Sequence, residues 1–515
     1  MGINAVKRDV PKTLFGRTYK PYSGAFSTEP TGVKSGRKFA PRVIKPTTKR
    51  IFDDLEQVIS KTNLRDGMTL SFIHNLRYGD YVINEVMNTV ASMGFKDLTL
   101  ASSALFPNHK PLIEHIHSGV IGSISGSMNG PIGKAVSTGE TPSIPTSLRS
   151  HGGRARAVET GDLHLDIAFI AAPAVDEQGN MNGCQGPSAY GACGFANDTD
   201  SVFADTVILV TDNLLTDEPV YPVVIRGSNV DYIVTIDKIG DPNKIVAGSL
   251  GKQFTKQHLD IAEQVVQVTE ATGYLKDGLS FQAGAGGVSL ATTQFINEVM
   301  TEKELLGSFV HGGTTEAAVK LLEDGLFKCI YDGQSFDLVA VRSLRENPRH
   351  IESSADASYN IWKPGGPLAN YVDVVALGAT EIDIDFNVNV NTHSDGLLLH
   401  GIGGHTDAAA AKMTIITCPI ARKVPIVREK VTTVSTPGEM IDVVITDAGI
   451  AVNPRRNDLQ KRFLEVGIDV KDIAELRDMA YSHAAPLEPD FSDEICTAVE
   501  FRDGTLLDVI YKVNV

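Results

Sequence analysis

The strongest constraint on the fold of this chain is that it repeats itself. The pentapeptide INEVM occurs at residues 83–87 and again at 296–300, after LRDGMTL in the first place and LKDGLSF in the second. Further along, residues 166–182 align with residues 373–389 at a constant offset of 207. The identical pairs in that block are Asp166 and Asp373, Ala172 and Ala379, Asp176 and Asp383, Asn180 and Asn387, and Asn182 and Asn389. Blocks that recur in the same order indicate two copies of one structural unit.

Each copy has the pattern of alternating strands and helices. Short apolar runs at 69–74 and 279–284 follow Asp-Gly turns, and apolar residues at helical spacing come next, over 81–95 and 292–306. Other runs are apolar on both faces, as in buried parallel strands, namely 97–102, 206–212, 232–237, 373–377 and 442–447. The pattern predicts an α/β protein with two pseudo-repeated, open, twisted and mostly parallel sheets, flanked by helices and packed against each other.

The length of the chain agrees with two units, because one hydrophobic core rarely serves more than ~250 to 300 residues and this chain has 515. We place a basic N-terminal segment at residues 1–50, a first α/β domain at 51–250 and a second at 251–515. The N-terminal segment contains twelve Lys or Arg residues against two acidic ones, whereas the whole chain carries a charge of −16. Such a segment can dock on an acidic partner or a phosphate-rich cofactor, or cross the chain's own acidic surface. The sequence leaves both interpretations open.

Composition excludes several classes of protein. An acidic chain is a poor ligand for nucleic acid. No apolar run reaches the ~18 residues of a membrane helix, and the N-terminus lacks the apolar core of a secretory signal. Five cysteines without CxxC spacing, and no His pair at helical spacing beside a carboxylate, predict no metal site. We expect a cytoplasmic protein whose partners include neither nucleic acid nor a membrane.

Two glycine-rich loops lie where strands are expected to end, which is where open α/β sheets bind ligands. QAGAGGVSL contributes Gln282, Gly284, Gly286 and Gly287, and LLHGIGGHTDAAAAK contributes Gly401, Gly403 and Gly404 ahead of an alanine-rich helical run. Backbone N–H groups in such loops can bind an anion or a carbonyl oxygen. Close packing of the backbone is the alternative interpretation.

The equivalent loop of the first copy carries side chains instead of glycines. His74, Asn75 and Arg77 stand there, and the phrase SLRSHGGRAR adds Arg149, His151 and Arg154. Arginine binds carboxylates through two parallel hydrogen bonds. The two copies together predict a shared site with a polyanion on one side and main-chain donors on the other, unless these residues belong to ordinary surface loops.

Several phrases resemble a known family. ALGATEIDIDFNVNV and GIGGHTDAAAAK resemble phrases of CoA-transferases, whose members are built from two related α/β halves. FIHNLRYGDYVINEVM, SHGGRA, QAGAGGVSLATTQF and ITDAGIAVNPRRNDL are similar to phrases of the citrate lyase alpha-subunit family. The resemblance extends from about residue 10 to the end of the chain.

That resemblance implies a transferase that exchanges acetate for citrate on a thioester, turning an acetyl carrier and citrate into a citryl carrier and acetate. The partners it implies are citrate, an acyl carrier protein, a lyase subunit and further copies of the chain. It implies no tightly bound cofactor. The thioester is carried instead by acetyl-CoA or by the phosphoribosyl-dephospho-CoA arm of the carrier protein. A transferase for another small acid such as citramalate, and a non-catalytic carrier-protein scaffold, stay open as alternatives.

The resemblance also implies roles for individual residues. Many CoA-transferases place a nucleophilic glutamate where this chain has Gly313, and glycine cannot carry a covalent acyl group. This favours direct attack of a citrate carboxylate on the thioester through a mixed anhydride, with Glu316 and Glu381 as alternative nucleophiles. We therefore expect catalytic roles for Gly403, Gly404, His405 and Glu381, citrate binding by His74, Asn75, Arg77, His151 and Arg154, and thioester binding by Gln282, Gly284, Gly286, Gly287 and Gly401.

Overall fold

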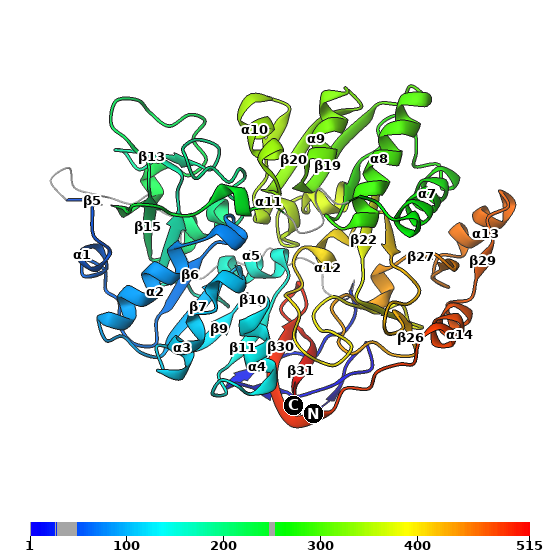
Figure 1. The fold of residues 1–515 in the computed structure, drawn as a ribbon, viewed down its shortest axis with the longest axis horizontal. Helices are drawn as coiled ribbons and strands as arrows, with labels where there is room; N and C mark the ends of the chain where they lie inside the picture. Colours follow the sequence, from blue (N-terminus) through cyan, green and yellow to red (C-terminus); the bar gives the residue numbers. More distant parts are fainter. Residues whose placement is uncertain (1, 26, 28–48, 247–252, 515) are drawn as a thin grey trace.

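The computed structural model describes residues 2–25, 27, 49–246 and 253–514, so nearly half of the basic N-terminal segment lies outside the described residues. Two α/β halves lie side by side, and the two chain termini lie together at one edge of the molecule (Figure 1). Among the described residues, no helix has the length and apolar character needed to cross a membrane.

The first half is built on a ten-stranded sheet. In spatial order its strands are β31 (Leu506–Val513), β30 (Phe491–Glu500), β11 (Thr146–Leu148), β9 (Ile121–Ser125), β7 (Leu98–Ser102), β6 (Thr69–Phe72), β12 (Ile167–Ala171), β15 (Thr206–Thr211), β17 (Tyr232–Thr235) and β5 (Ile51–Phe52). Neighbouring strands are parallel except for the antiparallel pair β30 and β31.

The second half is built on a nine-stranded sheet. Its order is β21 (His350–Glu352), β20 (Phe327–Ser335), β19 (Gly307–Thr314), β18 (Phe281–Ala283), β22 (Val374–Gly378), β25 (Met413–Thr417), β27 (Val443–Thr446), β28 (Gly449–Val452) and β29 (Val470–Lys471). Only β27 and β28 are antiparallel neighbours. The order β7-β6-β12-β15-β17 of the first sheet matches β19-β18-β22-β25-β27 of the second, which confirms the duplicated, mostly parallel architecture predicted from the repeats.

Helices flank both sheets, and the two predicted from the INEVM repeats are α2 and α8. The helices of the first half are α1 (Leu55–Ile59), α2 (Val82–Ser92), α3 (Leu112–His117), α4 (Pro131–Thr138), α5 (His151–Thr160) and α6 (Ser201–Phe203). Those of the second half are α7 (Lys256–Ala271), α8 (Gly287–Glu302), α9 (Glu316–Glu323), α10 (Leu338–Glu346), α11 (Ala355–Tyr359), α12 (His405–Ala408), α13 (Asn457–Glu465) and α14 (Ile473–His483).

The repeated Asp and Asn residues form the same turn in each half. Asp176 Oδ1 accepts hydrogen bonds from the backbone of Gln178 and Asn180, and Asp383 Oδ1 accepts them from the backbone of Asp385 and Asn387. These turns connect the strands of two small matching sheets, made of β14 (Met181–Asn182), β13 (Ala174–Asp176) and β16 (Leu214–Leu215), and of β24 (Val388–Asn389), β23 (Glu381–Asp383) and β26 (Val427–Arg428). The repeated aspartates therefore stabilise a turn in each half.

The C-terminal hairpin of β30 and β31 crosses back to the first half. Ser147 of β11 pairs with Ala498 of β30, so the last strands of the segment 251–515 extend the first sheet and not the second. The chain from residue 2 to 22 lies across this hairpin and includes β1 (Gly2–Ile3), β2 (Asp9–Val10), β3 (Thr13–Leu14) and β4 (Arg17–Thr18). Arg8 pairs with Asp508 at 3.1 Å and Arg17 with Glu500 at 2.9 Å, so these two arginines of the N-terminal stretch pair with acidic groups of the same chain.

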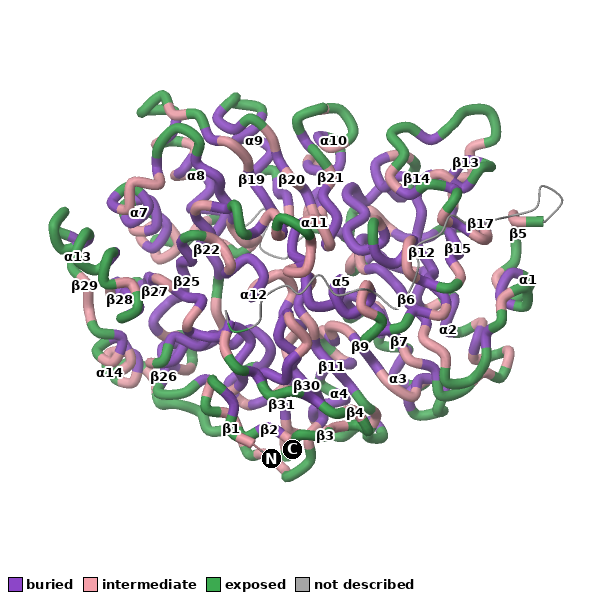
Figure 2. Tube along the Cα trace, turned by 180° about the vertical axis from the view of Figure 1, so that it is seen from behind, coloured by how far each residue is buried: buried purple, intermediate pink, exposed green. Residues whose placement is uncertain are grey.

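One large apolar core is continuous between the halves. It contains Leu100, Ile124 and Val158 of the first half together with Ile402 and Ile416 of the second. Figure 2 shows buried residues in the middle of the molecule, where α5 and α12 approach each other. Because apolar burial is shared, the two halves have a fixed relation that lets loops from both form one site.

Candidate active site

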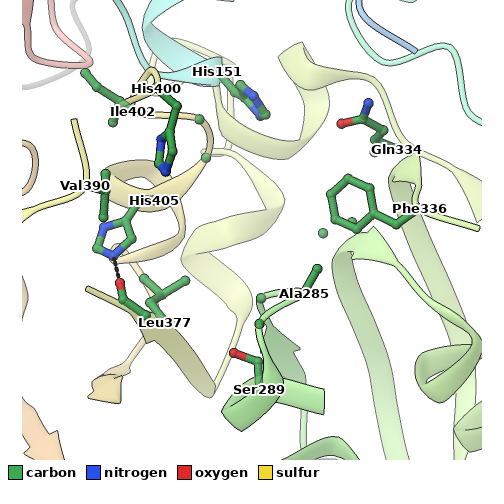
Figure 3. A pocket seen from close by; sticks show the side chains of 18 of the residues that line it. His151, Ala285, Ser289, Gln334, Phe336, Leu377, Val390, His400, Ile402 and His405 are labelled. Carbon is green, nitrogen blue, oxygen red and sulfur yellow. Dashed lines mark hydrogen bonds between the residues drawn. The ribbon is translucent and has the colours of Figure 1, made fainter. Parts of the chain in front are cut away.

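A cavity of about 570 Å³ lies between the two halves (Figure 3). The loop after β6 contributes His74, Asn75 and Arg77 to its wall, and the loop after β18 contributes Gly284 and Gly286. Gly403, Gly404 and His405 line it from the start of α12. The loops at 74–77 and 401–405, for which the sequence predicts one shared site, thus line the same cavity.

The contact between α5 and α12 holds these loops in place. The His151 backbone N–H donates to the carbonyl oxygen of Gly403 at 2.9 Å, and Asp407 accepts from the Gly152 N–H at 2.8 Å. A Cβ atom at Gly152 would lie 2.1 Å from the carbonyl oxygen of Tyr359, so any side chain at this position would clash with the backbone of α11. Glycine is therefore required where α5 meets the second half, and this close approach brings His151 onto the cavity wall.

Arg77 is a half-buried cation without a carboxylate partner among the described residues. It has a positive φ of 50°, and its guanidinium lies 4.8 Å from the centre of the Phe336 ring. Its Nε is buried and has no hydrogen-bond partner among the described residues, and burial lowers the pKa of Arg77. A strained backbone and a guanidinium on a cavity wall with no carboxylate partner among the described residues are typical of a group held ready for an anionic ligand.

The electrostatic character of the cavity is opposite to that of the chain. The chain carries a charge of −16, yet the described residues that line the cavity include Arg77 and Arg422 and no Asp or Glu. Burial lowers the pKa of His74 to about 3 and the pKa values of His151 and His405 to about 4, so these imidazoles are neutral at neutral pH. The positive charge of the cavity therefore comes from the arginines, and it favours a small polyanion.

Hydrogen bonds orient the cavity's imidazoles. His74 has its Nδ1 2.6 Å from Ser103 Oγ and its Nε2 3.1 Å from Gln334 Oε1. His405 has its Nδ1 2.8 Å from Thr436 Oγ1 and its Nε2 2.9 Å from the carbonyl oxygen of Gly378, the contact dashed in Figure 3. Because a carbonyl oxygen only accepts, His405 Nε2 carries the proton, and its ring is a fixed wall element rather than a free base.

The structure brings ten of the fourteen predicted site residues to the cavity. They are His74, Asn75, Arg77, His151, Gln282, Gly284, Gly286, Gly403, Gly404 and His405. It does not bring Arg154, Glu381, Gly287 or Gly401 to the wall. Gly401 donates its N–H to Ser127 Oγ at 2.7 Å, and a Cβ atom at Gly287 would lie 2.6 Å from the His258 ring, so both glycines serve packing.

Arg154 and Glu381 each form a buried ion pair inside the protein. The terminal nitrogens of Arg154 donate to the two carboxylate oxygens of Asp200 at 2.8 and 2.9 Å, behind the ring of Phe195. Glu381 is fully buried, where it pairs with Arg428 and accepts from Asn389 Nδ2 at 2.9 Å. Both charges are satisfied inside the protein, which is why neither stands at the cavity.

Several cavity residues carried no signal in the sequence. They are Phe195, Gln334, Phe336, Tyr359 and Arg422. They lie outside the repeated blocks and outside the glycine loops, so neither comparison of the two copies nor a local motif marks them. Only the packing of distant segments shows that they share a wall.

Two duplicated α/β halves with a cavity at their junction define a CoA-transferase-like protein. The alpha subunit of a malonate decarboxylase from Acinetobacter baumannii has this fold, with a TM-score of 0.62 at 14% identity over 84% of this chain and 89% of that chain. A much closer likeness is a structure described as the alpha subunit of citrate lyase in complex with citrate, from Streptococcus mutans. Its TM-score is 0.93 at 40% identity, over 99% of both chains.

Sequence comparison agrees with the structural likeness. The citrate lyase alpha chain of Klebsiella pneumoniae is 43% identical over 500 residues, which cover 96% of each chain. The family model of the citrate lyase alpha subunit matches residues 48–513. This chain belongs to the citrate lyase alpha-subunit family.

Proposed function

We propose that this chain exchanges acetate for citrate on a CoA-like thioester, turning an acetylated carrier protein and citrate into a citrylated carrier protein and acetate. The observation that supports this most directly is the interdomain cavity, where a half-buried Arg77 shares the wall with glycine loops and the described lining residues include no carboxylate. Citrate is a polyanion that such a wall can bind. The homologous structure from Streptococcus mutans that contains citrate supports the same assignment.

The chemistry requires positioning and electrostatic stabilisation rather than a metal or an acid-base pair. A citrate carboxylate oxygen bonds to the carbonyl carbon of the acetyl thioester, and the electron pair of that carbonyl moves to its oxygen. Collapse of this oxyanion breaks the carbon–sulfur bond and releases a thiolate, which leaves a mixed citryl-acetyl anhydride. The thiolate then attacks the citryl carbonyl and expels acetate. Main-chain N–H groups of the glycine loops are suited to bind the oxyanion.

Direct attack by citrate fits the residues available at the cavity. Gly313, which the resemblance to CoA-transferases aligns with their nucleophilic glutamate, lines the cavity. Glu316 is exposed and absent from the cavity wall, and Glu381 is held by Arg428. The described wall therefore offers no enzyme carboxylate to form an acyl-glutamyl intermediate.

The proposal extends to the partners of the chain. We expect an acyl carrier protein to deliver the thioester on a phosphoribosyl-dephospho-CoA arm, with acetyl-CoA as a soluble substitute. We also expect a lyase subunit that cleaves the citryl thioester, and association with further copies of this chain.

The test is to mix the purified chain with acetyl-CoA and citrate and to follow acetate and citryl-CoA by mass spectrometry. Formation of both products is expected. Turnover with citramalate in place of citrate would reassign the substrate. Binding of a carrier protein without turnover of any acid would make the chain a scaffold.

Trapping with hydroxylamine is expected to find no glutamyl hydroxamate on the chain during turnover, because the described residues that line the cavity include no carboxylate. The chain is incubated with acetyl-CoA alone, or with acetyl-CoA and citrate, and hydroxylamine is then added. Peptide mass mapping of each sample shows whether a glutamate has been modified. A modified Glu316 or Glu381 would refute the direct-attack route. A Glu316→Gln variant supplies the matched control, since it should exchange citrate at the wild-type rate.

A further inference from the structure

A chain of hydrogen bonds behind the cavity ends at a tyrosine hydroxyl that no motif marks. His311 Nδ1 lies 2.8 Å from Gln282 Oε1, and Gln282 Nε2 donates to Tyr359 Oη at 3.2 Å. All three side chains are buried, with 2%, 6% and 6% of their surfaces exposed. Gln282 and Tyr359 also line the cavity, so the chain links the interior of the second half to the wall of the site.

The direction of these hydrogen bonds follows from their geometry. An amide oxygen only accepts, so His311 Nδ1 carries the proton and donates to Gln282. Gln282 then presents its NH₂ group to Tyr359, whose oxygen accepts. The hydrogen of the Tyr359 hydroxyl is left without an acceptor among the described residues and is available to the cavity.

The opposite arrangement is unfavourable. Turning the Gln282 amide round would require His311 to carry its proton on Nε2, which is buried and has no partner among the described residues. A buried N–H without an acceptor is rarer and more costly than a buried lone pair without a donor. Burial lowers the pKa of His311 to about 4, which excludes a ring protonated on both nitrogens at neutral pH.

Two packing features hold the hydrogen bonds between His311, Gln282 and Tyr359 in one geometry. Gly312 has a φ of 107°, and a Cβ atom there would lie 2.8 Å from Gln282 Nε2, so a glycine leaves room for the amide. The His311 ring packs edge-on against Tyr359 with 5.2 Å between ring centres. Each residue of the chain is thus restrained by its neighbour.

Tyr359 belongs to the glycine-loop side of the cavity. A Cβ atom built on Gly404 would lie 3.5 Å from Tyr359 Oη, whereas Arg77 stands on the wall with Phe336. We propose that Tyr359 donates a hydrogen bond to the oxyanion formed at the thioester carbon, and that His311, acting through Gln282, is the positioning residue that keeps this hydroxyl a donor. Burial raises the pKa of Tyr359 well above its usual value, so the proton is shared with the oxyanion and not transferred. This inference rests on the proposed transferase function.

The test begins with Tyr359→Phe, which removes one oxygen and leaves the ring. We expect kcat for acetyl-CoA and citrate to fall about 100-fold, with each KM changed less than about threefold, because the bond forms only in the transition state. Retention of more than a third of kcat would overturn the proposal. So would a large rise in the citrate KM at constant kcat, which is the result for a ground-state citrate ligand.

The positioning role of His311 is tested by two variants and a double mutant. His311→Leu frees Gln282 to rotate and accept from Tyr359, and should lower kcat about tenfold, whereas His311→Asn keeps an N–H donor and should stay within about threefold of wild type. In the Tyr359→Phe background, His311→Leu should cause no further loss. Independent, multiplying losses would overturn the relay.

A measurement that does not depend on turnover tests the proposal even if a variant fails to fold. Nitrogen NMR of histidine-labelled protein, assigned with His311→Asn, should find His311 protonated on Nδ1, and the Nε2 form would refute the proposed direction. If wild type turns over another acid instead of citrate, the substrate proposal fails separately and the Tyr359 variants are assayed with that acid.

Discussion

Replacement of Arg77 by alanine is expected to raise the KM for citrate about 100-fold while the KM for acetyl-CoA changes less than about threefold. A charge-assisted hydrogen bond contributes about 1.5 to 3 kcal/mol, and a guanidinium can make two of them to one carboxylate. In this cavity no described carboxylate competes for Arg77, so its guanidinium is available to pair with a carboxylate of citrate. Initial-rate kinetics with each substrate varied in turn measures the effect.

Two further variants make this prediction specific. Arg77→Lys keeps the charge but loses the planar fork, and is expected to raise the citrate KM about tenfold. Arg345→Ala removes a surface arginine whose ion pair is with Glu346, and should leave both KM values at the wild-type level. Equal increases of both KM values in Arg77→Ala would remove Arg77 from the citrate site.

Replacement of Arg154 by leucine is expected to lower the free energy of unfolding by about 3 to 5 kcal/mol, because it leaves a buried carboxylate without its cation. Asp200 is 1% exposed and accepts hydrogen bonds from both terminal nitrogens of Arg154. Urea unfolding followed by far-UV circular dichroism measures the loss. The enzyme that remains folded should keep a citrate KM much closer to wild type than Arg77→Ala does.

The double variant Arg154→Leu with Asp200→Leu should recover most of the lost stability, since it removes both charges. A surface pair serves as the matched control. Lys320→Ala, which breaks the exposed pair with Asp324, is expected to cost less than about 1 kcal/mol. If Arg154→Leu kept full stability and lost citrate affinity instead, Arg154 would be the citrate ligand that its position in the sequence suggested.

The fold was predictable because its signals are local. Strands β6 and β18 and helices α2 and α8 are encoded by the spacing of apolar residues within a few turns of chain, and the repeated turns at Asp176 and Asp383 are closed by residues two to four positions away. The C-terminal hairpin was not predictable in the same way. Its strands have the same local pattern wherever they pair, and their position beside β11 depends on contacts about 350 residues apart.

The site was only partly predictable for a related reason. Arg77 and Arg154 look alike in the sequence, each beside a histidine and a glycine-containing loop. The difference between them is Asp200, a residue 46 positions from Arg154 that forms an ion pair with it, whereas no described carboxylate lines the cavity beside Arg77. The distinction between a binding group and a packing group is therefore a property of tertiary contacts.

By itself, the sequence determined that two copies of one α/β unit make up this protein, to which family it belongs, and which loops carry the cationic side chains and bare glycines. These features depend on neighbouring residues and on ancestry. The tertiary structure alone decided which of those side chains meet at the cavity, and it added Tyr359 and Phe336, which no motif marks. The physical reason is that burial and ion pairing depend on which distant segments the shared core brings into contact.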